Sequence, residues 1–226
     1  MGAKAWFAVY YNTDPRQTLG NAPVLDREAS AALAKRIMPD GALKEMEDGD
    51  LSFLNPDHGE VFVGVYGDLV IIAHPGLAAD RLSEIDGQWH SLGLGAKTYV
   101  HATHSVSDWC AFALWDQGKL VRALSVSPDG GIHEEIGERL PFERPYWDGE
   151  HPVEQDVDDD VEDEFDDDVE EEAYPFPFHP LELSEAALLE VLGYQFEGRP
   201  DDWVCDPMQI PIMRFGVQKE AWWKFW

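Results

Sequence analysis

The stretch WCAFALWDQGKLVRALSVS, residues 109–127, decides the fold class of this chain. Its two arms are rich in aromatic and aliphatic residues, and they flank the pair Gln117-Gly118. A glycine-containing pair between two such arms is typical of a β-hairpin. A second hairpin is predicted for residues 60–74, where the turn falls at Gly67-Asp68. Because a hairpin joins antiparallel neighbours, the two segments predict a largely antiparallel sheet.

Other segments add strands to this sheet. Apart from Lys4, residues 4–11 are apolar throughout, as expected of a central strand that is buried on both faces. Residues 97–103 and the segment that begins at Gly131 also have strand character. The segment 208–217 is predicted to be an edge strand, because Pro211 has no N–H to donate to a neighbouring strand.

Three helices are expected from apolar residues that recur along one face. The first covers about residues 26–37, with Asp26 as its N-cap. A shorter helix is expected within residues 78–87. In the third, Ser184 is a good N-cap and Gly193 a natural end. Together with about six or seven strands, these helices predict a single domain of the α+β class.

Composition and charge divide the chain into segments. Fourteen of the twenty side chains in residues 153–172 are carboxylates, and like charges at helical spacing repel. This segment is therefore predicted to be disordered in isolation. The expected organisation is an α+β core (1–152), an acidic insert (153–173), a helix and an edge strand that return to the core (174–217), and an aromatic tail (218–226).

The overall charge and the cysteine usage exclude several classes of partner and compartment. The chain has 226 residues and a formal net charge of -29, which disfavours direct binding to nucleic acid or to anionic membranes. No apolar stretch is long enough for a membrane helix. The two cysteines, Cys110 and Cys205, form no disulfide framework, and no signal peptide is recognised, so a cytoplasmic location is expected. No phosphate-binding glycine motif is complete, and no cofactor is predicted.

One short segment holds the ingredients of a metal or catalytic site. His101, His104 and Asp108 lie within eight residues of one another, and Glu134 or His133 could supply a further ligand. The alternative is a turn at the end of a strand, in which the polar side chains satisfy backbone amides. The sequence leaves both interpretations open.

The acidic insert carries regularly spaced apolar residues. Val153, Val157, Val161, Phe165 and Val169 recur at intervals of four, which would form one stripe on a helix. The insert is either a solvated spacer or a binding segment that lies on a basic protein surface. A calcium site of the EF-hand type is not predicted, because Val161 stands where the loop needs glycine.

Two aromatic segments are further candidates for binding. Tyr146 and Trp147 lie in the proline-rich stretch LPFERPYWDGEHP, which either forms a recognition surface or wraps over the sheet. Trp222, Trp223 and Trp226 lie in the C-terminal tail. Such an apolar tail is expected to dock on its own domain or on another chain.

Several longer motifs resemble a known family. They are MGAK at the start of the chain, HSVSDW (104–109), SPDGGI (127–132), LPFERPYWDGEHPV (140–153) and YPFPFHPLELSE (174–185). Together they resemble an uncharacterised actinobacterial family of unknown function, over roughly residues 1–153 and 174–217. The resemblance implies a soluble bacterial protein with no assigned activity, and it transfers no catalytic residue. The acidic insert and the aromatic tail depart from the family pattern.

These observations favour a protein that binds rather than one that catalyses. The expected role is a binding or regulatory module that contacts a basic protein partner through the acidic insert. One alternative is a metal-assisted hydrolase centred on His101, His104 and Asp108. Another is a module that binds a small molecule between the sheet and the helices.

Overall fold

The computed structural model describes residues 4–39, 42–153, 175–198 and 201–217. Most of the predicted acidic insert lies outside these ranges, and so do its apolar positions Val157, Val161, Phe165 and Val169. The tail residues Trp222, Trp223 and Trp226 lie outside them as well.

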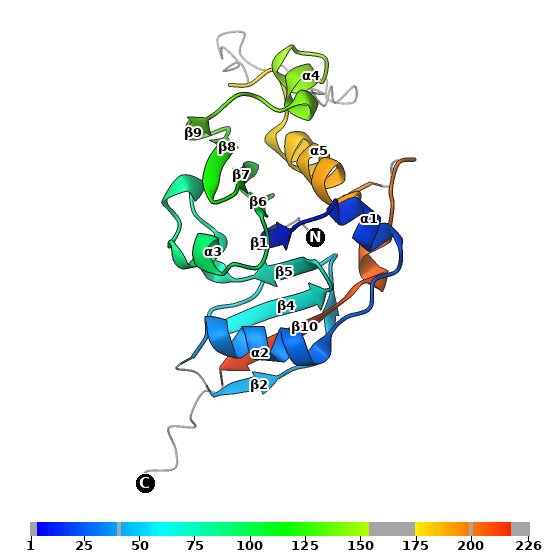
Figure 1. The fold of residues 1–226 in the computed structure, drawn as a ribbon. Coiled ribbons are helices and arrows are strands. Elements are labelled where there is room, and N and C mark those ends of the chain that lie inside the picture. Colours follow the sequence, from blue (N-terminus) through cyan, green and yellow to red (C-terminus); the bar gives the residue numbers. More distant parts are fainter. Residues whose placement is uncertain (1–3, 40–41, 154–174, 199–200, 218–226) are drawn as a thin grey trace, which may run out of the picture.

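The described residues form one antiparallel sheet of ten strands, with five helices (Figure 1). The strands are β1 (Lys4–Tyr11), β2 (Leu43–Glu45), β3 (Gly49–Asp50), β4 (Glu60–Tyr66), β5 (Leu69–Ala73), β6 (Lys97–His104), β7 (Trp109–Asp116), β8 (Lys119–Ser127), β9 (Gly131–Ile136) and β10 (Pro211–Val217). Their order is β2-β10-β4-β5-β1-β6-β7-β8-β9, and β3 pairs with β10. The α+β class is confirmed, but the sheet is larger than the predicted six or seven strands. Because β2 and β3 are only three and two residues long, they show no alternation in the sequence.

Strand β1 lies at the centre of the sheet, as its uninterrupted apolar sequence predicts. Successive side chains of a strand point to opposite faces. Phe7 and Val9 therefore belong to the hydrophobic core on one face, and Ala8 and Tyr10 belong to the core on the other. Since both faces are covered, the sheet separates two cores. Alternate residues of a strand therefore enter different cores.

The helices are divided between these two faces (Figure 1). Helices α1 (Pro15–Gly20) and α5 (Pro180–Leu192) contribute to the core that contains Phe7, and the short helix α4 (Arg144–Trp147) packs at its margin. Helices α2 (Arg27–Ile37) and α3 (Gln88–Ser91) cover the opposite face. In place of the short helix expected within residues 78–87, the chain forms two 3₁₀ turns, Pro75–Leu77 and Leu82–Glu84, followed by α3. A third 3₁₀ turn covers Pro141–Glu143, and a fourth covers Pro207–Gln209.

Strand β10 corrects the prediction of an edge strand. It lies between β2 and β4, with β3 paired to its first residues. Pro211 is the first residue of the strand, and pairing with β4 begins only at Met213. A proline at the first position of a strand removes no hydrogen bond that the inner ladder needs. The segment after the insert thus enters the interior of the sheet.

Helix α5 begins earlier than the sequence suggests. Its N-cap is His179, whose Nδ1 accepts a hydrogen bond from the Leu181 N–H, and Pro180 occupies the first helical position, where proline is favoured. Ser184, the predicted N-cap, instead lies buried within the helix. Gly193 ends the helix with a positive φ of 77°, as predicted. Similarly, the predicted cap of α2 is confirmed, because Asp26 accepts from the Ala29 N–H.

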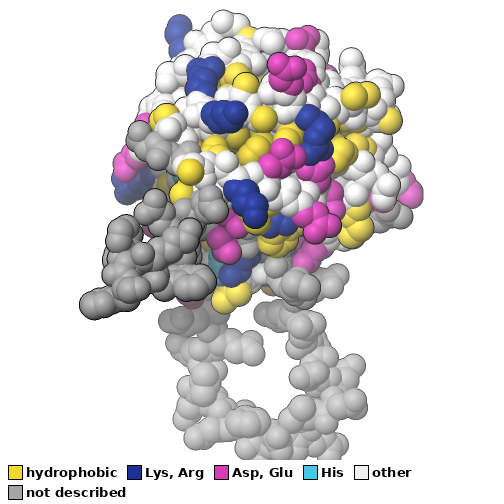
Figure 2. Space-filling model, turned by 90° about the horizontal axis from the view of Figure 1, so that it is seen from below, with side chains coloured by type: hydrophobic (Ala, Val, Ile, Leu, Met, Phe, Trp, Pro, Cys, Tyr) yellow, Lys and Arg dark blue, Asp and Glu magenta, His cyan; other side chains and the backbone are white. Residues whose placement is uncertain are grey.

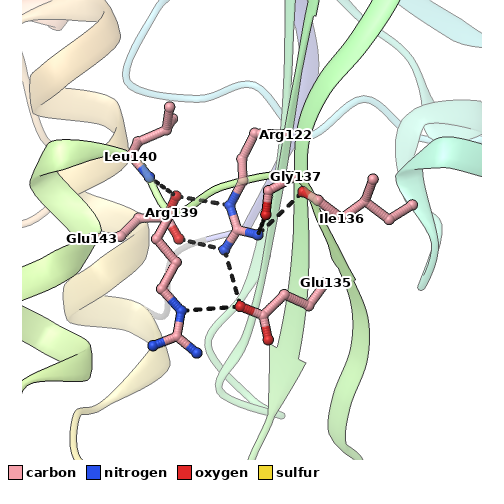
Figure 3. Close-up of polar contacts among 7 residues, drawn as sticks. All are labelled: Arg122, Glu135, Ile136, Gly137, Arg139, Leu140 and Glu143. Carbon is pink, nitrogen blue, oxygen red and sulfur yellow. Dashed lines mark hydrogen bonds and ion pairs between the residues drawn. The ribbon is translucent and has the colours of Figure 1, made fainter.

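A buried ion pair holds the segment that follows β9 against the sheet (Figure 3). Arg122 of β8 and Glu143 are both fully buried, and they form two hydrogen bonds of 2.9 and 2.5 Å. The guanidinium of Arg122 also donates to the carbonyls of Ile136 and Gly137, while Glu143 accepts from the Leu140 N–H. A buried charge is tolerated only when its hydrogen bonds are satisfied, as they are here. The pair therefore fixes the path of residues 136–143 (Figure 3).

Candidate functional site

The first predicted site residue, His101, is completely buried in β6. Its Nδ1 lies 2.9 Å from the hydroxyl of Tyr99, and its Nε2 lies 3.1 Å from the hydroxyl of Ser184 on α5. Burial lowers the pKa of His101 to about 3, so the ring is neutral at ordinary pH. With both nitrogens occupied and no contact with solvent, His101 serves as a polar link between the sheet and α5.

The other three candidates of this group lie elsewhere. Because His104 is three positions from His101 on one strand, it points to the opposite face. It pairs with the Ser107 hydroxyl at 3.4 Å. Asp108 lies in the turn after β6, and its carboxylate is 3.6 Å from Nε2 of His179. Glu134 of β9 accepts hydrogen bonds from Ser83 on the face opposite to His101.

The predicted metal ligands thus do not converge. His133, the alternative ligand, is 2.8 Å from the Ser127 hydroxyl. Within the described ranges, no group of three or more His, Cys, Asp and Glu side chains could hold a metal ion. The segment around Asp108 has the geometry of a turn at the end of a strand, where Asp108 itself adopts a positive φ of 44°.

A cavity of about 620 Å³ opens beside α5, where the sequence analysis placed no site. It receives side chains from β6, the N-terminal half of α5, the segment after α5 and the segment around α4. We call it the glutamate cavity, and its lining residues are Thr103, Tyr146, His151, His179, Leu181, Glu182, Glu185, Gln195, Glu197 and Gly198. This lining includes three carboxylates and neither lysine nor arginine, which gives the cavity a negative character.

Glu185 is the least exposed of these three carboxylates. It is partly buried, and its Oε2 accepts a hydrogen bond of 2.8 Å from the Phe196 N–H. Burial raises the pKa of Glu185 to about 7, against the opposing effect of the backbone hydrogen bonds. Near neutral pH the carboxyl group is therefore close to half protonated. A cation in the cavity would favour its ionised form, so binding and ionisation of Glu185 are linked.

One wall of the glutamate cavity is aromatic. The rings of Tyr146 and His151 are stacked, with centroids 4.2 Å apart and an angle of 13° between their planes. Next to them, Trp147 packs edge-on against Phe178 and lies under the guanidinium of Arg139, 3.8 Å from its ring centroid. The segment with Tyr146 and Trp147 therefore packs on the core, as one of the two interpretations of the sequence predicted. Trp147 covers the core, whereas Tyr146 lines a cavity.

The chain segments on either side of the acidic insert contribute residues to the glutamate cavity. The last described residue before the gap is Val153, the first residue of the insert, two residues after the lining residue His151. The description resumes at residue 175, four residues before the lining residue His179. Both attachment points of the carboxylate-rich segment are thus close in sequence to residues of the cavity.

Comparison with known proteins places the chain in a family. The model of the Family of unknown function (DUF6928) matches residues 5–215. The chain belongs to this family. The match confirms the resemblance to an uncharacterised family that the sequence motifs suggested, and the DUF6928 range includes all ten residues of the glutamate cavity. No curated protein and no solved structure matches the chain.

Glu182 and Glu185 share a face of α5, because they are three positions apart in the helix. The sequence did not indicate this pair, because the helix was predicted to start at the N-cap Ser184, after Glu182. Glu197 and His151 carried no signal in the sequence, since they approach α5 only through the fold.

Among the residues that the structure describes, no helix has both the length and the apolar character needed to cross a membrane.

Proposed function

We propose that this chain is a non-enzymatic binding protein that receives a positively charged side chain of a basic protein partner in the glutamate cavity. The observation that carries this proposal is the lining of the cavity. Glu182, Glu185 and Glu197 supply carboxylates, and no lysine or arginine among the lining residues offsets them. Hydrogen bonds between a carboxylate and the charged group of lysine or arginine are stronger than hydrogen bonds between neutral groups.

The aromatic wall supports a cation in the same place. A lysine or arginine side chain gains from contact with the face of an aromatic ring, and its aliphatic stem packs on the ring. Tyr146 and His151 present such a stacked pair beside Glu182. The cavity is therefore suited to the whole side chain of a partner residue, both its apolar stem and its charged end.

The acidic insert fits this proposal as an element that attracts the partner. Fourteen carboxylates in residues 153–172 would raise the rate at which a basic protein meets the cavity, and this long-range effect is weakened by salt. The apolar residues Val157, Val161, Phe165 and Val169 would then add contact area on the partner. The insert provides attraction, and the cavity provides selection of a side chain.

The underside of the molecule is not the proposed contact surface. Figure 2 shows that this side carries lysine and arginine side chains interspersed with acidic and apolar ones. Mixed charges also occur at α2, where Arg27 pairs with Glu45 and Asp48. A surface with both signs of charge does not select a basic partner, whereas the glutamate cavity carries carboxylates without lysine or arginine.

The proposed setting of this interaction is the cytoplasm of an actinobacterium. The motifs shared with the actinobacterial family support the source, and the free thiols of Cys110 and Cys205 are compatible with a reducing compartment. Direct binding to nucleic acid or to a membrane surface is not proposed, because the net charge of -29 opposes it.

Titration with a synthetic oligolysine peptide tests the proposal. The wild type should bind the peptide in a salt-dependent manner. The double variant Glu182→Gln/Glu185→Gln should bind about tenfold more weakly, because two charge-assisted hydrogen bonds are weakened. Removal of residues 154–172 should slow association more than it speeds dissociation.

The matched control is Glu190→Gln. Glu190 lies on the same helix but does not line the glutamate cavity, so this variant should bind like the wild type. Equal affinity of the wild type and the double variant would refute the cavity as the binding site. Equal association rates with and without residues 154–172 would refute the role of the insert.

A further inference from the structure

A second hollow, of about 500 Å³, lies near the C-terminal end of α5, away from the glutamate cavity. The two share no lining residue. We call it the tyrosine hollow, and it is lined by Tyr11, Asn12, Thr13, Asp14, Pro15, Arg16, Lys97, Tyr99, Leu114, Leu140, Pro141, Phe142, Glu190 and Val191.

The floor of the tyrosine hollow is set by the register of three neighbouring strands. In this register, Tyr11 of β1 pairs with Lys97 of β6, and Tyr99 of β6 pairs with Leu114 of β7. Directly paired residues of antiparallel strands point to the same face. These four side chains therefore lie together on the face that α5 covers.

The walls of the hollow are largely apolar and incompletely covered. Five lining side chains pack against the core yet keep part of their surface exposed, namely Tyr11, Leu114, Leu140, Phe142 and Val191. The buried ion pair between Arg122 and Glu143 holds one wall in place, because Glu143 accepts from the Leu140 N–H and follows Phe142. The apolar surface is thus supported by fixed structure and is suited to the body of a small apolar molecule.

Two cationic side chains reach the hollow from separate elements. Arg16 lies on α1 and Lys97 begins β6, and neither forms an ion pair with any described residue. Two carboxylates also line the hollow. Asp14 accepts the N-cap hydrogen bond of α1 from the Arg16 N–H, and Glu190 is exposed, as Lys97 is. Asp116 is the strand partner of Lys97 but does not line the hollow.

We propose that the tyrosine hollow binds a small organic acid. Its aromatic or branched aliphatic body packs on Leu140, Phe142 and Val191, and its carboxylate lies between Arg16 and Lys97. Two cations that line one apolar hollow, and that form no ion pair with a described residue, match this combination of charge and shape. The proposal is independent of the basic partner, since the glutamate cavity contributes no residue to this site.

Phenylacetate is a suitable probe, with phenylacetamide as its uncharged counterpart. The full chain is titrated with each compound while the amide resonances are followed by NMR. Phenylacetate should shift the resonances of residues around Tyr11, Lys97 and Leu114, and phenylacetamide should bind at least about fivefold more weakly. Equal binding of the two compounds would overturn the assignment of an acid, and no saturable shift with phenylacetate would overturn the site.

Variants locate the charge that recognises the probe. Arg16→Gln and Lys97→Gln should each weaken phenylacetate binding by about fivefold. Lys119→Gln is the matched control, because Lys119 is an exposed lysine at the start of β8 and does not line the hollow. The amide spectrum of each variant reports whether it is folded. Loss of binding in Lys119→Gln alone, or unchanged binding in both Arg16→Gln and Lys97→Gln, would contradict the proposal.

Discussion

His101 and Ser184 are hydrogen-bonded inside the protein although they are 83 residues apart in the sequence. His101 belongs to β6 and Ser184 to α5, and both are buried. Their contact places α5 against the centre of the sheet, and α5 in turn carries residues of both the glutamate cavity and the tyrosine hollow. A histidine that looked like a catalytic residue thus positions the helix that borders two hollows.

Replacement of Ser184 by alanine should destabilise the fold. The variant leaves Nε2 of His101 buried without a partner, and an unsatisfied buried polar group costs about 1–3 kcal/mol. The free energy of unfolding, measured by urea denaturation, should fall by this amount. Ser107→Ala, at an exposed serine beside His104, is the control and should change the stability by less than about 0.5 kcal/mol. Equal stability of wild type and Ser184→Ala would show that this hydrogen bond contributes nothing.

Acid should destabilise the protein through His101. Its pKa is about 3 in the folded state and near the ordinary 6.5 in the unfolded chain, so the unfolded state binds more protons between these values. The stabilising contribution is present above about pH 6.5 and is lost progressively as the pH falls toward 3. On its own this linkage amounts to roughly 4 kcal/mol. Unfolding curves of wild type and His101→Gln at several pH values test it, because the variant should lose less stability than the wild type over this range.

Glu185 should have the opposite pH dependence. Its pKa is raised to about 7 by burial, so the protonated form is favoured in the folded state. The stabilising contribution is present below about pH 4.5 and is lost as the pH rises through 7. Glu185→Gln keeps an acceptor for the Phe196 N–H and removes the buried charge. It should therefore raise the free energy of unfolding by about 2 kcal/mol near pH 8 and leave it little changed near pH 5. A loss of stability at the higher pH would contradict the burial of this charge.

The pair of Arg122 and Glu143 should tolerate joint replacement better than single replacement. Arg122→Met leaves the Glu143 carboxylate buried without its partner, which should cost about 3–5 kcal/mol. In Arg122→Met/Glu143→Leu no buried charge remains, and much of this loss should be recovered. Chemical denaturation of the two variants measures the difference. Should the double variant be as unstable as the single one, the hydrogen bonds to Ile136, Gly137 and Leu140 matter more than the charges.

Gly137 is required for the turn that leads from β9 into the Arg122 contact. It has a φ of 79°, and a Cβ atom there would lie only 1.9 Å from the carbonyl oxygen of Val121. Gly137→Ala should therefore cost more than about 3 kcal/mol, because backbone must move. Gly118→Ala is the control, since Gly118 has a similar φ of 75° but open space around it. This variant should cost only about 1 kcal/mol, and thermal unfolding of both variants checks the contrast.

Most of the strands and the main helices could be predicted from the sequence, because their signals are local. The hairpin at Gln117-Gly118 and the cap at Asp26 depend on residues within a few positions, and both occur as predicted. The prediction that Ser184 is an N-cap was wrong, because a contact with a residue distant in sequence overrides the local preference. A serine favours an N-cap locally, but here its hydroxyl pairs with His101 of a distant strand, and His179 caps the helix.

The predicted site residues also show that closeness in sequence and closeness in space differ. His101, His104 and Asp108 are neighbours in sequence, yet strand alternation and a turn direct them to different surroundings. By contrast, Glu185 and His151 are far apart in sequence and line one cavity. Proximity along the chain did not indicate proximity in space at either place.

By itself the sequence determined the α+β class, the hairpins that build the antiparallel sheet, the membership of the family and the concentration of negative charge in one segment. These features depend on side-chain periodicity, on turn chemistry and on composition, which act over short distances along the chain. Only the tertiary structure decided that β10 enters the interior of the sheet and that α5 borders two hollows of different charge. The physical reason is that hollows form where elements distant in sequence pack together, and this packing depends on long-range contacts such as that of His101 with Ser184.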